Sequence, residues 1–264
     1  MGFFSRFRHV VFFLILMPTF VFADDYEVYS KHLELLLEGT PRPSVASVAS
    51  GFGAGNRVSF FAVSYSDKDL QTDLDDDDGS IIAGVGLGDP QGSLGIEVAI
   101  GITSVSTAFW GDGKFADEGN FNLKVHKFVP PLLFGNSASF AIGSSNLTGW
   151  GGTVEIPRND YLVYSENKFV GEYFQYGLAY TLGYGSAVAN GESEEALFGG
   201  IGIARSDYNG SVSFMNEEVH LSATWYLPNL RGVTINVTRA DLFNKNGSER
   251  NIFTLGYSYD LGDL

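Results

Sequence analysis

The chain contains no cysteine. This excludes a disulfide framework, the usual support of small secreted domains, and it excludes a lipid anchor carried on a cysteine. Basic residues are also few, because 16 Lys and Arg stand against 31 Asp and Glu and give a formal net charge of −15. Such a balance argues against nucleic-acid partners and against adhesion to anionic lipid surfaces.

Long apolar runs are missing as well, with one short exception near the start. The run Val10–Phe22 follows a basic N-terminus and is shorter than the roughly 20 residues that a spanning helix needs. Val21 and Ala23 are small enough to precede a signal-peptidase cleavage site. We therefore predict a cleaved signal peptide over residues 1–23, with an uncleaved membrane anchor as the alternative.

An exported chain without a spanning helix is either a soluble secreted protein or a β-barrel. The composition favours the barrel. The chain has 33 Gly, which let strands coil and approach closely, and it has 13 Tyr and 22 Phe, which suit the aromatic girdles of a membrane barrel.

The last segment of the chain alternates with a period of two. One face carries Phe253, Leu255, Tyr257, Tyr259 and Leu261, and the other carries Thr254, Gly256, Ser258 and Asp260. The same alternation recurs in the ranges 94–102, 121–126, 174–184, 219–227 and 233–238. A soluble β-sandwich alternates too, but the small and polar second face together with the export signal favours a membrane barrel.

We predict an all-β fold, a closed antiparallel up-and-down transmembrane β-barrel of about twelve strands over residues 57–264. The expected strands lie near 57–66, 79–88, 93–105, 119–129, 137–145, 159–166, 172–185, 195–205, 211–216, 218–228, 232–243 and 251–261. The segment 211–216 is included because bacterial single-chain barrels have an even number of strands. This parity puts the short turns 89–92 and 228–231 in the periplasm. It puts the longer connections 67–78, 106–118, 146–158 and 244–250 outside the cell.

Residues 24–56 differ from the rest of the chain. Several leucines stand among charges in the range 26–38, and the sequence Thr40-Pro41-Arg42-Pro43 then breaks any helix. Two interpretations stay open: a short amphipathic helix that lies against the barrel or plugs it, and a mobile N-terminal extension.

The C-terminus resembles the sorting signal of bacterial outer-membrane β-barrels. Thr254, Gly256, Tyr259 and Leu261 occupy its polar, glycine and two apolar positions, although the chain continues through Gly262–Leu264 where family members usually end on the final aromatic. The resemblance implies location in the bacterial outer membrane and insertion by the barrel-assembly machinery. It also implies contact with outer-membrane lipid and lipopolysaccharide.

A second resemblance rests on three short motifs. The ranges 86–90 (GLGDP), 95–98 (GIEV) and 122–126 (NLKVH) look like a group of uncharacterised bacterial outer-membrane barrels. Those barrels in turn resemble the barrel parts of exopolysaccharide-export accessory proteins. The resemblance implies a connection with surface polysaccharide and assigns no functional residues.

An acidic cluster lies in the first expected outer loop. Asp73, Asp75, Asp76, Asp77 and Asp78 crowd oxygen ligands of the kind that Ca²⁺ or Mg²⁺ prefers. Their spacing is not that of an EF-hand loop. A solvated run of charges is the alternative, and weak divalent bridging to lipopolysaccharide phosphates is a third interpretation.

Several ionisable residues are expected to face the barrel interior. Glu97, Lys124, His126 and Arg205 would line the lumen or cross-link it. A barrel of this size stands between the filled interior of small barrels and the open pore of large porins, which favours a narrow or plugged lumen.

His220 and Ser222 share one face of an expected strand. This resembles the His-x-Ser pair of lipid-hydrolysing outer-membrane barrels, in which an imidazole activates a hydroxyl. The expected register points His220 into the lumen instead of toward lipid, and no acid or Asn is evident to orient the imidazole. Two polar residues on an inward face are what any barrel shows.

The sequence therefore predicts a non-enzymatic channel or envelope protein of the outer membrane without a cofactor. A link to surface polysaccharide secretion follows from the second resemblance alone. The alternatives are a lipid-modifying hydrolase that uses His220 and Ser222, and a soluble secreted sandwich. The transported solute and the oligomeric state are left open.

Overall fold

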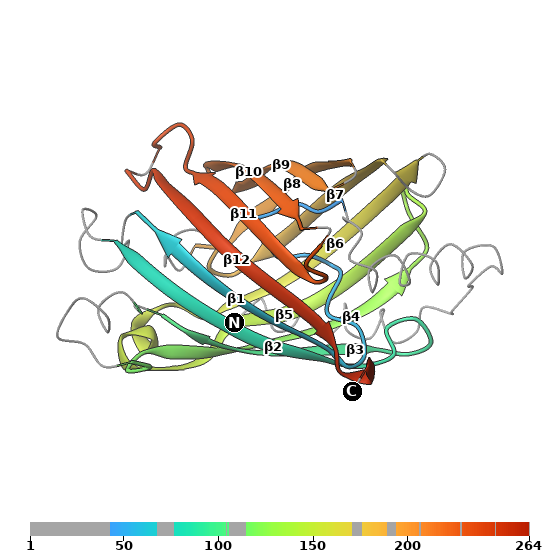
Figure 1. The fold of residues 1–264 in the computed structure, drawn as a ribbon. Coiled ribbons are helices and arrows are strands. Elements are labelled where there is room, and N and C mark those ends of the chain that lie inside the picture. The colour runs from blue at the N-terminus through green and yellow to red at the C-terminus, as the bar shows by residue number, and fades with distance from the viewer. Residues whose placement is uncertain are drawn as a thin grey trace.

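The computed structural model describes residues 43–67, 77–103, 105, 115–170, 176–188, 194–205, 207–227, 229–245 and 247–263. Twelve strands form one closed antiparallel barrel, in which each strand pairs with its neighbours in sequence and β12 closes the ring on β1. Figure 1 shows the strands running obliquely around a single ring. The predicted all-β, up-and-down barrel is confirmed.

The strands follow the expected order. They are β1 (Val58–Ser66), β2 (Asp78–Gly88), β3 (Gly95–Ile102), β4 (Gly119–Val129), β5 (Ser137–Trp150), β6 (Asn159–Val170), β7 (Tyr176–Gly185), β8 (Ala196–Arg205), β9 (Tyr208–Met215), β10 (Glu218–Tyr226), β11 (Val233–Ala240) and β12 (Arg250–Asp260). Two short 3₁₀ turns, η1 (Gly151–Glu155) and η3 (Leu261–Asp263), follow β5 and β12. In the described part of the chain, no helix has the length and hydrophobicity to span a bilayer.

The main departure from the expected strands is in β5, which continues to Trp150 instead of ending near residue 145. Asn146 adopts a left-handed backbone conformation (φ 52°) and its N–H donates to Asn122 Oδ1 at 2.9 Å. The pairing of β4 with β5 shifts register at this point, between Phe121 and Leu123. A β-bulge here absorbs two extra residues of β5, because two steps on β4 face four steps on β5, and it lets the strand continue into the predicted loop.

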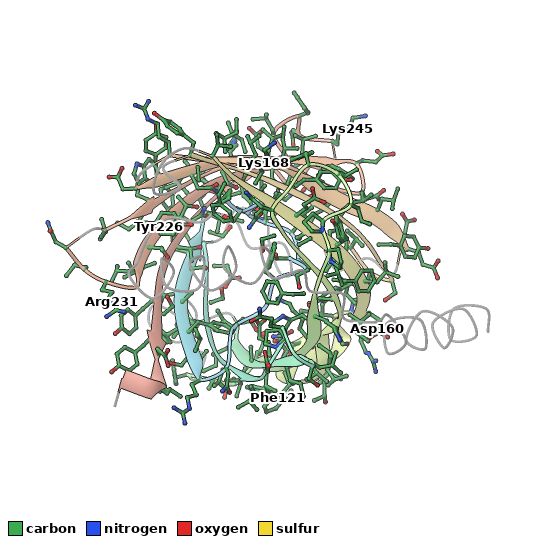
Figure 2. The ribbon with its side chains drawn as sticks, turned by 90° about the vertical axis from the view of Figure 1, so that its right-hand side faces the viewer. Phe121, Asp160, Lys168, Tyr226, Arg231 and Lys245 are labelled. Carbon is green, nitrogen blue, oxygen red and sulfur yellow. The ribbon has the colours of Figure 1, made fainter. Side chains whose placement is uncertain are left out.

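The two faces of the sheet have opposite character. Outward residues such as Val98, Ile100 and Leu178 are exposed at about two fifths of their surface (39%, 40% and 40%). Inward residues are mainly small or hydroxyl-bearing, and Ser139 and Ser165 are buried (0% and 2%). Figure 2, which looks along the barrel, shows Phe121 and Arg231 on the outside of the ring.

This arrangement is the reverse of a soluble protein, in which apolar side chains pack inside. An exposed apolar surface on a closed sheet is stable in hydrocarbon, because every strand has two partners and no edge is left unpaired. The soluble sandwich is therefore excluded, and the barrel spans a membrane.

The start of β1 and the end of β12 lie at the same end of the barrel (Figure 1). The antiparallel order puts the β2–β3, β4–β5 and β10–β11 connections at this end too. In outer-membrane barrels the end that carries both termini and the short turns is the periplasmic end.

Candidate functional site: a lumen crossed by an irregular segment

Residues 43–56 lie inside the barrel as an extended, irregular segment that precedes β1. Its pale blue trace is enclosed by the ring of strands in Figure 2. Residues 43–56 contain no helix, while the possible helix within 26–38 and the predicted signal peptide over 1–23 lie outside the described residues. The segment is held by hydrogen bonds to side chains on the inward faces of five strands, β3, β4, β6, β9 and β10.

The first part of this inner segment lies along β9 and β10. Ser44 N–H donates to Asn209 Oδ1 at 3.1 Å, and Asn209 Nδ2 donates back to Ser44 O at 3.2 Å. Ala46 N–H donates to Ser211 Oγ at 3.1 Å. These side chains take the place that a neighbouring strand would have, and so satisfy backbone groups that lie inside the protein.

The middle of the inner segment touches the wall at Gly51. Its N–H donates to Ser165 Oγ on β6 at 2.9 Å. A Cβ at this position would lie 2.2 Å from Ser139 O and 2.8 Å from Ser165 N, both of which are backbone atoms. Glycine is therefore required here because the two backbones approach too closely for a side chain.

The last part of the inner segment is held by three ionisable residues that were expected to face inward. Glu97 Oε2 accepts the Ala54 N–H at 2.7 Å, and Glu97 Oε1 lies 3.1 Å from Lys124 Nζ. Lys124 Nζ also donates to Phe52 O at 3.4 Å. His126, which is 1% exposed, places Nε2 3.3 Å from Ala54 O. The three side chains thus meet on residues 52–54 and cross-link the lumen.

Arg205, the fourth residue that was expected inside, lies on the outer face. It shares that face of β8 with Ile201 and Ile203, which are 60% and 59% exposed. Its guanidinium carbon lies 5.4 Å from the centre of the Tyr176 ring. The physical reason is its position at the periplasmic end of the strand. There a long basic side chain can extend along the barrel to the membrane surface and stack on an aromatic ring.

A second polar cluster lies toward the opposite, outer end of the barrel. The side chains of Glu218 and His220 are fully buried, and Glu218 Oε2 lies 3.4 Å from His220 Nε2. Ser248 Oγ donates to Glu218 Oε1 and to Asp241 Oδ2, both at 3.1 Å. Arg250 Nη1 donates to Ser248 O at 3.0 Å. This cluster ties β10 and β12 to the β11–β12 connection.

The sequence reasoning found His220 but missed Glu218 and Asp241. The available signal for Glu218 was its spacing, because a residue two positions before His220 on the same strand must share its face. Asp241 carries no such signal, since it follows the end of β11 and reaches the cluster through the connection.

Ser222 belongs to a ladder of hydroxyl and amide groups. Its Oγ lies 2.8 Å from Thr238 Oγ1, and it lies 3.5 Å from Ser47 Oγ of the inner segment. Thr238 Oγ1 donates to Asn236 Oδ1 at 3.0 Å, and Asn236 Nδ2 donates to Thr224 Oγ1 at 2.8 Å. In this arrangement the Ser222 hydroxyl is engaged with another hydroxyl and not with the His220 imidazole.

The inner segment leaves the opposite wall of the lumen partly open to solvent. The inward positions of β12 and β1 and those in the periplasmic half of β11 are half-buried or exposed, whereas Thr238 and Ala240 in the outer half of β11 are buried. The half-buried or exposed positions include Thr234, Asn236, Thr254, Gly256, Ser258 and Ser64. Ser64 Oγ and Thr254 Oγ1 lie 2.8 Å apart across the closing pair of strands. The accessible wall is therefore lined mainly by uncharged polar groups, with Phe60 and Ile82 as apolar neighbours.

The acidic cluster lies mostly outside the described residues, because Asp73, Asp75 and Asp76 fall there. Asp77 and Asp78 are described, and Asp78 Oδ1 accepts the Gly79 N–H at 2.6 Å. Within the described ranges, no group of three or more His, Asp or Glu side chains is placed to hold a metal ion.

The residues of the C-terminal motif lie where the barrel closes. Thr254 and Gly256 face the lumen on β12, opposite Ser64 and Ala62 of β1. Tyr259 lies near the end of the same strand, and its ring is stacked on Tyr257 with centroids 6.4 Å apart. Leu261 begins η3 and donates its N–H to Arg57 O at 3.0 Å.

No family model and no curated protein matches the chain. Among solved structures, the chain is similar to the KdgM porin in complex with disordered oligogalacturonate, with a TM-score of 0.50 and 6% identity over 76% of this chain and 98% of that one. It is also similar to Omp33 of Acinetobacter baumannii, with a TM-score of 0.44 and 8% identity over 80% and 100% of the two chains.

At this identity the likeness to KdgM is one of fold. The chain thus has the fold of a porin-like barrel of the bacterial outer membrane, in agreement with its apolar outer face.

Proposed function

We propose that the protein is a passive outer-membrane channel for small, uncharged polar solutes. The observation that carries this proposal is the accessible lumen wall of β11, β12 and β1, which is closed on all sides by paired strands and lined by hydroxyl and amide groups. Such groups replace the hydrogen bonds that a sugar-like solute gives up when it leaves bulk water.

The charges inside the barrel support a channel that does not select strongly for ions. Glu97 is paired with Lys124, and Arg250 approaches the cluster that holds Glu218 and Asp241. Paired charges give a weak field along the axis, whereas ion-selective pores carry rings of charge of one sign.

The inner segment limits the size of the solute. Residues 43–56 occupy the side of the lumen next to β6 and β9, so transport uses the remaining side. KdgM, a porin of similar fold, has been solved with an oligogalacturonate. We expect this chain to admit smaller solutes than an oligosaccharide, because its lumen is crossed by its own backbone.

The test is reconstitution of the full-length mature protein in phosphatidylcholine liposomes and planar bilayers. We expect liposome swelling with arabinose and glucose, little swelling with a trisaccharide, and a small conductance with weak ion selectivity. If the reconstituted barrel neither conducts at any voltage nor swells liposomes, the channel proposal is wrong and a structural role in the envelope takes its place.

A role in surface polysaccharide secretion is the second candidate. It is supported by the motif 86–90, which lies in β2 and the turn after it at the periplasmic end of the barrel. A strain that lacks the protein would then lose surface polysaccharide while other barrel proteins stay at normal levels. Unchanged surface polysaccharide in that strain would remove this candidate without affecting the channel.

A further inference from the structure

The β4–β5 connection at the periplasmic end differs from an ordinary turn. Residues 130–136 read Pro-Pro-Leu-Leu-Phe-Gly-Asn. Leu132, Leu133 and Phe134 are exposed at 76%, 62% and 45% of their surface. Three consecutive apolar side chains at the tip of a loop would be unfavourable in water and call for an explanation.

This loop lies on the outer face of the barrel. It contacts Glu166 on β6, and the neighbouring residue Ser165 points inward, because its Oγ binds the inner segment at Gly51. Successive residues of a strand point to opposite faces, so Glu166 points outward. Its fully buried carboxylate is covered by the loop.

Glu166 accepts hydrogen bonds from four consecutive backbone N–H groups of the loop. Oε2 accepts those of Leu132 and Leu133 at 2.9 and 3.0 Å. Oε1 accepts those of Phe134 and Gly135 at 2.6 and 2.5 Å. The Tyr164 hydroxyl donates to the same carboxylate.

The remaining residues of the loop leave no backbone donor unsatisfied. Pro130 and Pro131 have no N–H, and Asn136 N–H donates to Asn167 O at 2.9 Å. Every backbone N–H from residue 130 to residue 136 is therefore either missing or bonded inside the protein. The three large side chains of this stretch nevertheless stay exposed.

The β2–β3 turn at the same end of the barrel has the opposite design. Its tip carries Asp89, Gln91 and Ser93, and the Asp89 carboxylate accepts the Gln91 N–H at 3.0 Å in an exposed position. Water can satisfy the other polar groups of such a turn. The internal bonding of every N–H group in residues 130–136 is what hydrocarbon requires of backbone donors, because no water is present there to bond a free N–H.

We propose that residues 130–136 form a loop embedded in the acyl chains of the periplasmic leaflet, with Glu166 as the acceptor that makes the irregular backbone compatible with lipid. The occupant of the apolar surface is lipid because the loop is continuous with the lipid-facing wall. On β7, Leu178 and Tyr180 lie opposite Lys168 and Glu166, and Leu178 and Leu182 are exposed at 40% and 41%.

Because the chain has no native cysteine, a single introduced cysteine can be labelled specifically. Leu133→Cys is labelled with a nitroxide in the full-length protein, reconstituted in phosphatidylcholine vesicles. Collisions of the label with oxygen and with a water-soluble nickel chelate are then measured. Leu178→Cys on the lipid-facing wall and Gln91→Cys in the polar turn are the two matched controls.

We expect the label at 133 to behave like the label at 178, with high oxygen and low nickel accessibility. Nickel accessibility as high as at 91 would place the loop in water and overturn the proposal. Low accessibility to both reagents would place the loop against a second copy or another protein and would also overturn it. If Leu133→Cys does not give a heat-modifiable folded barrel, the same accessibilities are measured for a label at Leu132→Cys in the same loop.

Discussion

Two irregular segments lie on opposite faces of the same barrel wall, and each is held by a glutamate. Inside, the segment 43–56 gives one backbone N–H, that of Ala54, to Glu97. Outside, the loop 130–136 gives four to Glu166. The inner segment spreads its remaining bonds over side chains of four other strands, β4, β6, β9 and β10, whereas the outer loop concentrates its bonds on one carboxylate.

The difference follows from the medium on each side. In a lumen that holds water, a backbone group without a protein partner can bond to solvent, so no single side chain has to satisfy the whole segment. In hydrocarbon, each unsatisfied backbone group costs several kcal/mol, so every N–H group must have an acceptor within the protein. We therefore expect single substitutions to have large effects outside and graded effects inside.

The largest effect is expected for Glu166→Ala. The change removes an acceptor from four backbone N–H groups at once, of which the Leu132 N–H keeps a second acceptor, Tyr164 Oη at 2.9 Å. Leaving a buried donor unsatisfied costs about 1–3 kcal/mol for each group. Since the loop can partly rearrange, we expect the free energy of unfolding in vesicles to fall by roughly 4 kcal/mol, measured by urea titration.

Two variants control this experiment. Glu217→Ala makes the same change in an exposed turn and should change stability by less than about 0.5 kcal/mol. Glu166→Gln keeps one acceptor oxygen, so its loss in free energy of unfolding should lie between those of Glu166→Ala and Glu217→Ala. If Glu166→Ala lowers the free energy of unfolding as little as Glu217→Ala does, then the outer loop does not depend on a single acceptor.

A smaller effect is expected for Gly51→Ala, which perturbs the inner segment where it touches β5 and β6. The added Cβ would meet backbone atoms of Ser139 and Ser165, which cannot move aside. The segment must then shift toward the open side of the lumen. We expect the single-channel conductance to fall on the order of twofold, because the accessible path narrows while the barrel wall is unchanged.

Gly55→Ala is the matched control, since a Cβ there meets only Val58 Cγ2 at 3.5 Å, an ordinary contact. Its conductance should equal that of the unmodified protein. An unchanged conductance in Gly51→Ala, in a barrel that still shows heat-modifiable mobility, would mean that the inner segment does not border the conducting path.

Opposite changes of ion selectivity are expected at the Glu97–Lys124 pair. Lys124→Met leaves the carboxylate without its partner, which lies at 3.1 Å, and should favour cations. Glu97→Gln leaves the ammonium and should favour anions, while its amide oxygen still accepts the Ala54 N–H. The reversal potential under a potassium chloride gradient reports the sign. Shifts in the same direction for both variants would show that ions do not pass this pair.

The alternation of side chains was sufficient to predict the barrel, because each strand residue faces one of only two media. It failed at Arg205, where the end of a strand leaves the hydrocarbon and an outward charge is tolerated. The placement of residues 43–56 was beyond sequence reasoning. Its bonds join groups 43 to 175 positions apart and use serine and asparagine side chains without any periodic pattern.

The Glu166 site was missed for a different reason. Near the end of an expected strand, a glutamate looks like an ordinary rim charge. The signal lay in its partner, the run Pro130 to Phe134, which is too apolar for a turn in periplasmic water and lacks N–H groups at its first two positions. Neither the apolar run nor Glu166 indicates the site by itself, because only the fold brings residues 132–135 to residue 166.

The smallest effect is expected for Ser222→Ala, which separates the channel from the lipid hydrolase. A nucleophile must bond to its base, but Ser222 Oγ lies 2.8 Å from Thr238 Oγ1 and inside the lumen, away from lipid. Loss of the bond to Thr238 and of the longer one to Ser47 Oγ at 3.5 Å should together cost about 1 kcal/mol in stability. Conductance, phospholipase activity and the lipid profile of the cells should not change. A loss of lipid hydrolysis in this variant, with the barrel still folded, would instead give the inner wall a chemical role. The bond between Ser222 and Thr238 would then belong to the resting state of an enzyme. Ser222→Ala therefore disturbs the structure least but decides most directly between a channel and a hydrolase.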